Sequence, residues 1–327
     1  MTRERLLEIL SRFHDSRILV VGDCMVDQWI WGKVNRISPE APVPVVEVDF
    51  HTYTPGGASN VVSNLSSLGA RASIFGIRGR DDPGKKLVAA LRGKGIDVDG
   101  LLVDYRRPTT LKTRIIAHSQ QVVRADYETR QPVSGRLLDK LLRKIGEALK
   151  SARGLLISDY GKGIVSPELL EELVRLARKT GVFVSGGPKP RNAHLFRNFS
   201  LIALNQSEAS AASAVLIQDE DSLALAAEKL LKTLTPDSLV ITRGEHGMSC
   251  YDPEGRVFHH PALASQVYDV SGAGDTVIAV LTLALACGAT LQEGTHLANH
   301  AAGIVVKKLG TATVSANEMT TSINGQE

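Results

Sequence analysis

The sequence has little cysteine and no closely spaced cysteine pair. Only three cysteines occur in 327 residues: Cys24, Cys250 and Cys287 lie far apart, without Cys-x-x-Cys spacing. An odd number of scattered cysteines argues against both a disulfide framework and a structural zinc site. We therefore expect buried thiols in a reducing compartment, the cytoplasm.

An excess of charge of one sign and long apolar runs are also missing. The 38 basic residues nearly balance the 35 acidic residues and are spread along the chain, so no segment predicts an arm for nucleic acid or membrane. Residues 1–14 lack the apolar core of a signal peptide. The most apolar run, residues 276–287, is too short to span a bilayer. These absences predict a cytoplasmic protein that binds neither nucleic acid nor membrane.

The common glycine motifs for nucleotides are incomplete. Residues 79–86 have P-loop spacing but end in Lys86, where a Ser or Thr must reach magnesium. The first strand is not followed by Gly-x-Gly-x-x-Gly, which argues against a dehydrogenase. His259 and His260 have no further ligands at useful spacing, so they do not predict a metal site.

Short apolar runs alternate with helical patterns along most of the chain. With 43% hydrophobic and 22% charged residues, the chain can bury a large core. Strands are expected over residues 17–23, 73–77, 154–158, 182–185, 201–204 and 239–242. Helices are expected over residues 58–68, 84–94, 135–151, 167–180, 220–234 and 276–287. This alternation predicts a doubly wound, mostly parallel α/β sheet in one domain over residues 1–315.

Two segments break this alternation. Residues 29–54 carry prolines among valines, residues 109–127 are rich in β-branched side chains, and neither has a helical period. We expect both to form a small β-flap outside the main sheet. Because so small a flap exposes an apolar face, it either covers the active site as a lid or pairs with a second subunit in a homodimer. Residues 316–327 are expected to be a disordered tail.

The segment 269–276 carries the strongest chemical signal. Gly272 and Gly274 let backbone N–H groups approach an anion closely, and the helix that follows adds partial positive charge. Asp275 places a carboxylate in this anion site, where it can take the proton from a hydroxyl that attacks ATP. In isolation the same pattern would more often be a helix cap, so the assignment depends on the rest of the chain.

Two motifs together resemble the ribokinase-like (PfkB) carbohydrate kinases. Gly-Ala-Gly-Asp-Thr at 272–276 is similar to that family's C-terminal signature, and Gly-Gly-Ala-Ser-Asn at 56–60 to its N-terminal element of two glycines and a following Asn. Each motif alone would be an ordinary turn or helix start. The resemblance implies a ribokinase-like fold, ATP as phosphate donor, Mg²⁺, and Asp275 as the general base.

Other stretches resemble a narrower group, the bacterial D-glycero-β-D-manno-heptose-7-phosphate kinases. Residues 35–46, Asn-Arg-Ile-Ser-Pro-Glu-Ala-Pro-Val-Pro-Val-Val, match that group almost letter for letter, and the similarity runs from about Ile18 to Val314. It implies transfer of the ATP γ-phosphate to the anomeric hydroxyl of a heptose 7-phosphate in lipopolysaccharide core synthesis. The enzyme would be a stand-alone kinase or the kinase half of a bifunctional protein.

The resemblance also implies roles for individual residues. Sugar hydroxyls are expected at Asp27, Gly56, Gly57 and Asn60. The phosphate of the substrate needs cations, and the candidates are Arg114, Arg124 and Lys162. Asp159 follows a buried strand end, where ligands gather in open α/β sheets, and is also expected to bind the substrate. The nucleotide is expected at Lys189, Asn205, Thr242, Gly244, Gly247, Gly272, Ala273 and Gly274, with Glu208 holding Mg²⁺ through water. Solvated strand arginines and ordinary turn or helix caps remain the alternatives for Arg114, Arg124, Asp159, Asn205 and Glu208.

One position departs from the pattern. The heptose kinases usually have Asp-Pro-Lys where this chain has Gly187, Pro188 and Lys189. The missing acid leaves open a catalytically degenerate protein that only binds a sugar or acts as a regulator. Within the enzyme class, a kinase of another sugar or sugar phosphate remains the alternative.

Overall fold

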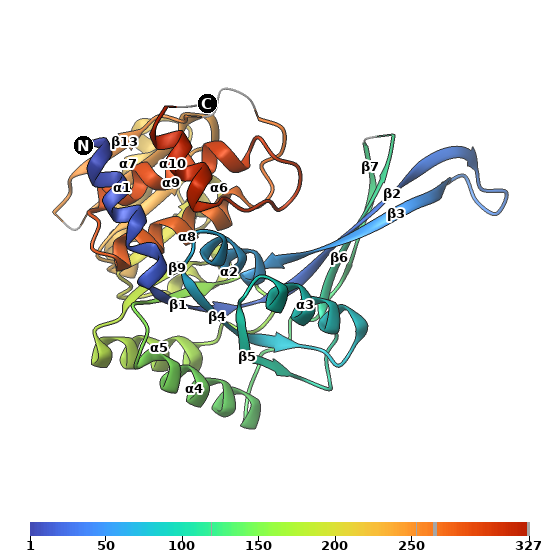
Figure 1. Ribbon diagram of the computed structural model, residues 1–327, viewed down its shortest axis with the longest axis horizontal. Helices are drawn as coiled ribbons and strands as arrows, with labels where there is room; N and C mark the ends of the chain where they lie inside the picture. Colours follow the sequence, from blue (N-terminus) through green and yellow to red (C-terminus); the bar gives the residue numbers. More distant parts are fainter. Residues whose placement is uncertain (119, 253, 264–266, 326–327) are drawn as a thin grey trace.

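The computed structural model consists of a large β-sheet with helices on both faces and a smaller β-sheet that projects from it (Figure 1). It describes residues 1–118, 120–252, 254–263 and 267–325. The doubly wound, mostly parallel α/β fold that the sequence predicts is confirmed.

Nine strands of the described chain form the large sheet: β1 (Arg17–Gly22), β4 (Arg71–Arg78), β5 (Asp97–Val103), β8 (Gly154–Ser158), β9 (Phe183–Gly187), β10 (Leu201–Asn205), β11 (Leu239–Thr242), β12 (Met248–Tyr251) and β13 (Val257–His260). Their order is β13-β12-β11-β10-β9-β8-β1-β4-β5. Neighbours from β5 to β11 run parallel, and β12 and β13 add antiparallel strands at one edge. Parallel pairing follows from the strand-helix alternation, because each helix returns the chain to the same end of the sheet.

The smaller sheet is made of four strands: β2 (Cys24–Ile37), β3 (Pro44–Gly57), β6 (Thr110–Ala117) and β7 (Gln120–Tyr127). They come from the two segments without a helical period, and their order is β3-β2-β6-β7. Strands β2 and β3 form a long antiparallel ribbon that extends beyond the main body (Figure 1). Because β2 begins directly after β1, the smaller sheet starts at the carboxyl end of the large one.

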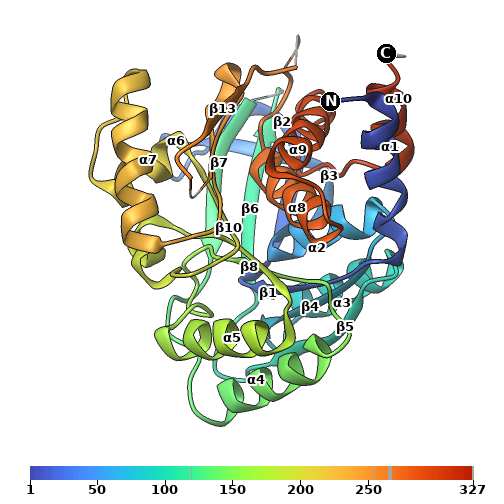
Figure 2. The ribbon, with the colours of Figure 1, turned by 90° about the vertical axis from the view of Figure 1, so that its left-hand side faces the viewer.

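The helices cover both faces of the large sheet: α1 (Arg3–Ser11), α2 (Ala58–Ser67), α3 (Asp82–Gly93), α4 (Arg136–Leu149), α5 (Pro167–Thr180), α6 (Gln206–Ser213), α7 (Glu220–Leu234), α8 (Ala273–Ala286), α9 (Leu291–Val305) and α10 (Ala316–Ile323). Figure 2 shows α4 and α5 on one face and α2, α8 and α9 on the other. The sheet therefore has a hydrophobic core on each side.

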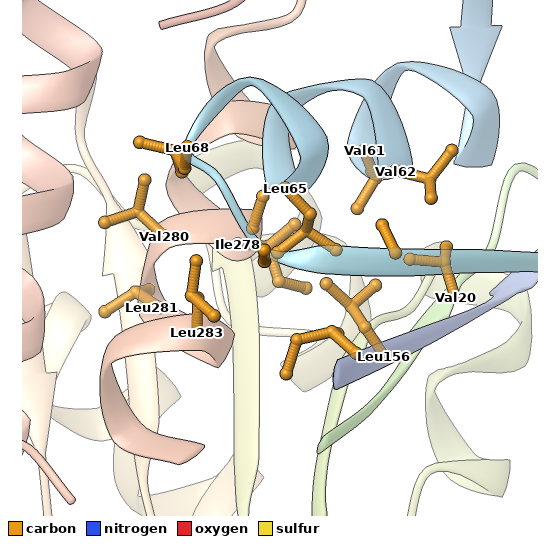
Figure 3. Close-up of a cluster of buried hydrophobic side chains, with 14 of the residues drawn as sticks. Val20, Val61, Val62, Leu65, Leu68, Leu156, Ile278, Val280, Leu281 and Leu283 are labelled. Atoms are coloured by element: carbon orange, nitrogen blue, oxygen red, sulfur yellow. The ribbon is translucent and has the colours of Figure 1, made fainter. Parts of the chain in front are cut away.

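The alternation of side chains along β1 shows how one strand serves both cores. Val20 packs with α2 and α8, including Leu65 and Ile278 (Figure 3), whereas Leu19 and Val21 belong to the core beneath α4 and α5. Successive residues of a strand point to opposite faces. A central strand buried on both faces must therefore be continuously apolar, as residues 18–22 of β1 are.

Some elements differ from what the sequence pattern indicates. Helix α8 begins at Ala273, three residues before the apolar run, so Asp275 lies in its first turn. The pattern does not predict β5, β12, β13 or α9. Helix α9 mixes glycines, histidines and small residues, which hides its apolar stripe.

The prediction of a disordered tail is wrong for residues 316–323, which form α10. Ser315 and Glu318 make a capping box at its start, and Met319 is fully buried in the core. One buried apolar residue and a good cap stabilise a short helix that composition alone does not reveal. Residues 326–327 of the predicted tail lie outside the described residues.

In the described part of the chain, no helix is both long enough and apolar enough to cross a bilayer. Helix α8, the most apolar one, has 14 residues and is buried between α2, α9 and the large sheet.

Replacing Leu65 by Ala should test the packing of α2 on the sheet. Leu65 is fully buried, so its truncation leaves a cavity and should lower the free energy of unfolding by about 2–5 kcal/mol. Chemical denaturation would measure the change. Leu225→Ala, at a helix position that is 54% exposed, is the matched control. Equal losses for the two variants would contradict this account.

Candidate active site

A cleft opens where the carboxyl ends of the parallel strands meet the smaller sheet. Open α/β sheets bind their ligands at this position, because the loops that leave neighbouring strands diverge there. The predicted site residues that line the cleft are Asp27, Gly57, Arg114, Asp159, Lys189, Asn205, Glu208, Thr242, Gly272, Gly274 and Asp275.

Asp275 lies in the cleft with both carboxylate oxygens engaged. Its Oδ2 accepts a hydrogen bond from Nδ2 of Asn60 at 2.9 Å, and its Oδ1 accepts one from the phenol of Tyr160. The residue at the helix N-cap is Gly272, so the alternative that Asp275 is a helix cap is wrong. Desolvation raises the pKa of Asp275 to about 6, and the hydrogen bonds from Tyr160 and Asn60 oppose this rise.

Two glycines allow the starts of α2 and α8 to meet. Gly272 has a φ of +81°, and a Cβ there would lie 2.8 Å from Nδ2 of Asn60. Gly57 has a φ of +57°, and a Cβ there would lie 2.6 Å from the carbonyl oxygen of Asp23. Any other residue would be strained at these φ values and would collide with its neighbour. The two glycine motifs of the sequence therefore form one site.

One wall of the cleft contains an ion pair between two residues that the sequence predicts to bind the substrate. Nη1 of Arg114 lies 2.6 Å from Oδ1 of Asp27, and the guanidinium also lies 4.7 Å from the ring centroid of Trp29. Gly56 contacts the same carboxylate, because a Cβ there would lie 2.2 Å from Oδ2 of Asp27. The pair is nearly buried, so it fixes both side chains at the junction of β2 and β6.

Two predicted cations lie elsewhere. Among the described residues, the cleft walls include neither Arg124 nor Lys162. Arg124 pairs with Asp126 on strand β7 and is half exposed, and the ammonium of Lys162 pairs with Glu128. Arg124 is placed by strand β7 and Lys162 by the loop after β8, and the sequence did not reveal the paths of these segments.

A second cavity, lined mainly by apolar residues, adjoins the cleft. It contains three further predicted nucleotide residues, Gly244, Gly247 and Ala273, and it shares Thr242 and Gly274 with the cleft. Its apolar walls come from Ala262, Leu263, Val267, Val270 and Val306. A polar cleft joined to such a cavity suits a ligand that has phosphates at one end and a flat base at the other.

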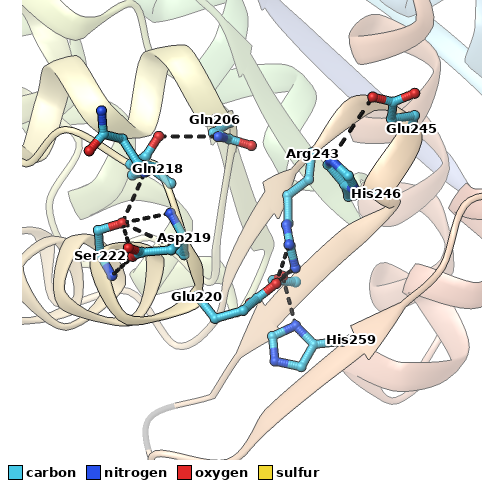
Figure 4. Close-up of polar contacts among 11 residues, drawn as sticks. Gln206, Gln218, Asp219, Glu220, Ser222, Arg243, Glu245, His246 and His259 are labelled. Carbon is cyan, nitrogen blue, oxygen red and sulfur yellow. Dashed lines mark hydrogen bonds and ion pairs between the residues drawn. The ribbon is translucent and has the colours of Figure 1, made fainter.

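The turn between β11 and β12 is anchored from behind (Figure 4). Its Arg243 pairs with Glu220 at the start of α7 and donates to Oγ of Ser249 at 3.1 Å. Oγ of Ser249 also lies 2.9 Å from Nδ1 of His259 on β13. These contacts hold the turn that carries Gly244 and Gly247.

Asn205 and Glu208 form the capping box of α6, as the helix-cap alternative expects. Glu208 nevertheless lines the cleft, and its Oε1 lies 2.6 Å from Nζ of Lys189. In the part of the chain that the structure describes, no cluster of three or more acids, histidines or cysteines could hold a metal by itself. A single carboxylate beside a phosphate site fits Mg²⁺, which keeps most of its waters and binds substrate phosphates.

Comparison with known families identifies this arrangement. Residues 15–318 match the model of the pfkB family carbohydrate kinases. The chain belongs to this family. This carbohydrate kinase has the cleft between the two sheets and the adjoining cavity described above.

Curated relatives cover this carbohydrate kinase from end to end. It is 43% identical over 326 residues to the bifunctional protein HldE of Geobacter metallireducens. The alignment covers 100% of this chain and 66% of that relative. It is 44% identical over 317 residues to the protein of the same name from Desulfatibacillum aliphaticivorans, and the alignment covers 97% of this chain and 65% of that relative. The chain thus spans just under two thirds of the length of these relatives.

Solved structures share the fold of this kinase. Arabidopsis thaliana ribokinase, complexed with ribose and ATP, superposes with a TM-score of 0.77 at 18% identity, covering 94% of this chain and 98% of that one. Escherichia coli phosphofructokinase-2, in complex with potassium, superposes with a TM-score of 0.76 at 21% identity. The superposition covers 95% of this chain and 99% of that one. At these identities the likeness concerns the fold.

Lys112 and Tyr160 are among the cleft residues that the sequence did not reveal. Lys112 lies two residues before Arg114 in β6, and residues two apart share a face of a strand, so this signal was present. Burial and the neighbouring Lys162 lower the pKa of Lys112. The contact of Tyr160 with Asp275 depends on the path of the loop after β8, and no local pattern indicates it.

Gly187, where the chain departs from the heptose kinases, lines the cleft at the end of β9. A Cβ there would lie 3.1 Å from Cδ1 of Ile278, so a side chain would fit only after a small shift of that methyl group. The position is therefore tight, and it lies in the wall of the cleft.

Proposed function

We propose that this carbohydrate kinase transfers the γ-phosphate of ATP to the anomeric hydroxyl of D-glycero-β-D-manno-heptose 7-phosphate, giving the 1,7-bisphosphate used for ADP-heptose and the lipopolysaccharide core. The observation that carries the proposal is the position of Asp275 between a cation-lined sugar side and a nucleotide cavity. The proposal is supported by the sequence identity to the HldE proteins. It is also supported by residues 35–46, which resemble the heptose-7-phosphate kinases and contain the tip of the β2–β3 ribbon.

The acceptor is proposed to lie between the two sheets. Asp27 and Asn60 offer an acceptor and a donor for sugar hydroxyls, and the chain at Gly56 and Gly57 allows a sugar to approach the backbone. Hydrogen bonds from fixed groups orient the anomeric hydroxyl toward Asp275, so that little entropy is lost at the reacting step. These groups orient the acceptor and do not react.

The phosphate of the acceptor is proposed to bind cations on the smaller sheet. Lys112 and Arg114 face the cleft from one side of β6, and Arg offers a fork where Lys offers a point charge. Asp159 at the end of β8 stays a prediction for binding the substrate. Arg124 and Lys162 stay predictions for the phosphate role. Each would have to leave the partner it has in the structure.

The chemical step is proposed to begin with Asp275. Its carboxylate takes the proton of the anomeric hydroxyl while the oxygen forms a bond to the γ-phosphorus. The bond from that phosphorus to the β-phosphate oxygen breaks, and ADP leaves with its electron pair. Backbone N–H groups at the start of α8 and the ammonium of Lys189 stabilise the developing negative charge. Mg²⁺, held through water by Glu208, would neutralise phosphate charge when bound.

A cytoplasmic location also belongs to this proposal. Its support is the three cysteines, each a free and buried thiol, which suit a reducing compartment where ATP is available.

A homodimer through the smaller sheet is a further part of the proposal. The ribbon exposes Ile37, Val48 and Phe50, and β7 exposes Val123. Phe50 stacks on Trp31 with ring centroids 6.0 Å apart. Exposed apolar side chains on a projecting sheet are typical of an interface.

The substrate is tested by phosphorus NMR of the product. With ATP and Mg²⁺, heptose 7-phosphate should yield a second phosphate ester at the anomeric carbon, and kcat/KM should exceed that for ribose and fructose 6-phosphate. Preference for another sugar would establish the alternative kinase. No ADP release with any member of the panel would favour the degenerate sugar-binding protein that Gly187 left open.

Asp275→Asn removes the proposed base but keeps the size of the side chain. We expect kcat to fall by about 10²–10⁴-fold with little change in the KM for ATP, measured by coupled ADP release. Asp219→Asn is the matched control, because Asp219 is an exposed acid at the start of α7 and Asn also caps helices. Unchanged turnover in Asp275→Asn would eliminate Asp275 as the base.

Phe50→Glu tests the dimer. A charge placed in a buried apolar interface is costly, so the variant should sediment as a monomer at micromolar concentration while the wild type sediments as a dimer. Leu225→Glu, on exposed helix α7, should leave the dimer intact. A monomeric wild type would refute the interface.

A further inference from the structure

The phenol of Tyr160 contacts the proposed base, Asp275, directly. Tyr160 lies in the loop after β8 and donates its hydroxyl hydrogen to Oδ1 of Asp275. Burial and the nearby carboxylate of Asp275 raise the pKa of Tyr160 well above its ordinary value, so the phenol stays protonated and remains a donor at neutral pH.

The loop that carries Tyr160 is held by a buried carboxylate. Oδ2 of Asp23, at the end of β1, accepts the backbone N–H groups of Tyr160 at 2.8 Å and of Lys162 at 2.9 Å. Its Oδ1 accepts the N–H of Ile164 at 3.2 Å. Asp23 is only 4% exposed. Three hydrogen bonds to one buried carboxyl group fix the backbone of this loop. Only the two side-chain torsions of Tyr160 then remain to be ordered.

Asp159 fixes the same loop from its other side. Its Oδ1 accepts the N–H of Gly161 at 2.7 Å, and its Oδ2 accepts the N–H of Lys189 at 3.0 Å and Nδ2 of Asn192 at 2.9 Å. The carboxyl groups of Asp23 and Asp159, at the ends of the neighbouring strands β1 and β8, thus fix the position of Tyr160. An arrangement this well determined indicates that the contact with Asp275 is built into the fold.

Each oxygen of Asp275 has a donor from a different element. Asn60 approaches from the start of α2, and Tyr160 approaches from the loop after β8. Two donors on opposite oxygens fix the rotation of the carboxylate about its last torsion, which is otherwise broad. A carboxylate oxygen can accept more than one hydrogen bond, so room remains on each oxygen for the proton of an acceptor hydroxyl.

We propose that Tyr160 is a positioning residue for phosphoryl transfer: held in place by Asp23, its phenol orients the carboxylate of Asp275 toward the acceptor hydroxyl and keeps it ionised. The inference rests on the proposed role of Asp275 as the base.

The charged groups that face Asp275 set the direction of the expected change. Lys189 lowers the pKa of Asp275 and Asp27 raises it, while the phenol of Tyr160 and the amide of Asn60 lower it. Tyr160→Phe removes one donor to the charged form and leaves the other groups in place. The pKa of Asp275 should therefore rise in this variant.

Carbon NMR measures this rise without turnover. In protein labelled with ¹³C at the aspartate carboxyl carbons, the Asp275 signal is identified by its loss in Asp275→Asn. Its titration midpoint in Tyr160→Phe should lie about one pH unit above that of the wild type, since a hydrogen bond to a charged group is lost. Tyr105→Phe, which removes a phenol that is 74% exposed, should titrate as the wild type does.

Kinetics supply the second readout, with whichever sugar the wild type phosphorylates. Tyr160→Phe should lower kcat by about 10–100-fold through misorientation of the base, leave both KM values within twofold, and move the acidic limb of kcat/KM to higher pH. Tyr105→Phe should match the wild type. Thermal unfolding at an unchanged midpoint would show that the fold is retained.

Three outcomes would overturn the inference. An unshifted carboxyl midpoint would show that the phenol does not stabilise the ionised base. A large rise in the sugar KM at constant kcat would assign Tyr160 to substrate binding instead. Full activity with an unmoved acidic limb would leave the contact without a function. If the wild type phosphorylates no sugar, the proposed function fails, and the NMR titration still decides the role of Tyr160.

Discussion

The hydrogen bond between Asn60 and Asp275 joins the starts of two helices, and the rest of the site depends on it. The two residues are 215 positions apart in the sequence. They meet because α2 and α8 pack side by side on one face of the large sheet, where Oγ1 of Thr276 also donates to Oδ1 of Asn64 at 3.0 Å. Gly272 permits this approach, since a Cβ would occupy the place of the Asn60 amide. The two glycine motifs that border the cleft are thereby fixed relative to each other.

Buried acids at strand ends organise the loops around this junction. Asp23 and Asp159 follow β1 and β8, and both are nearly inaccessible to solvent. A buried carboxylate is costly unless hydrogen bonds compensate it, and here backbone N–H groups of the following loops supply them. The acids therefore shape the cleft through the backbone. This arrangement places side chains such as Tyr160 and Lys189 with little freedom.

The smaller sheet contributes a different kind of wall. Strand β2 continues almost directly from β1, so the two sheets share one strand connection at the cleft. The buried pair of Asp27 and Arg114 ties β2 to β6 at this point, while the outer ribbon carries exposed apolar side chains. The inner end is therefore part of the site, and the outer end is a surface that a partner subunit can cover.

The sequence by itself determined the alternation of strands and helices, the flap segments and the residues of the two glycine motifs, because each is written in a local pattern of apolar spacing or glycine placement. The site was predictable where a motif carries it, as for Asp275 and Asn60. The position of Lys112 could also be read from its spacing to Arg114 along one strand face. Only the tertiary structure decided that Tyr160 lines the cleft and that Arg124 and Lys162 pair elsewhere. It also decided that residues 316–323 fold as a helix. These outcomes depend on strand register, loop path and burial against distant elements, and such contacts between residues far apart in sequence leave no local pattern to read.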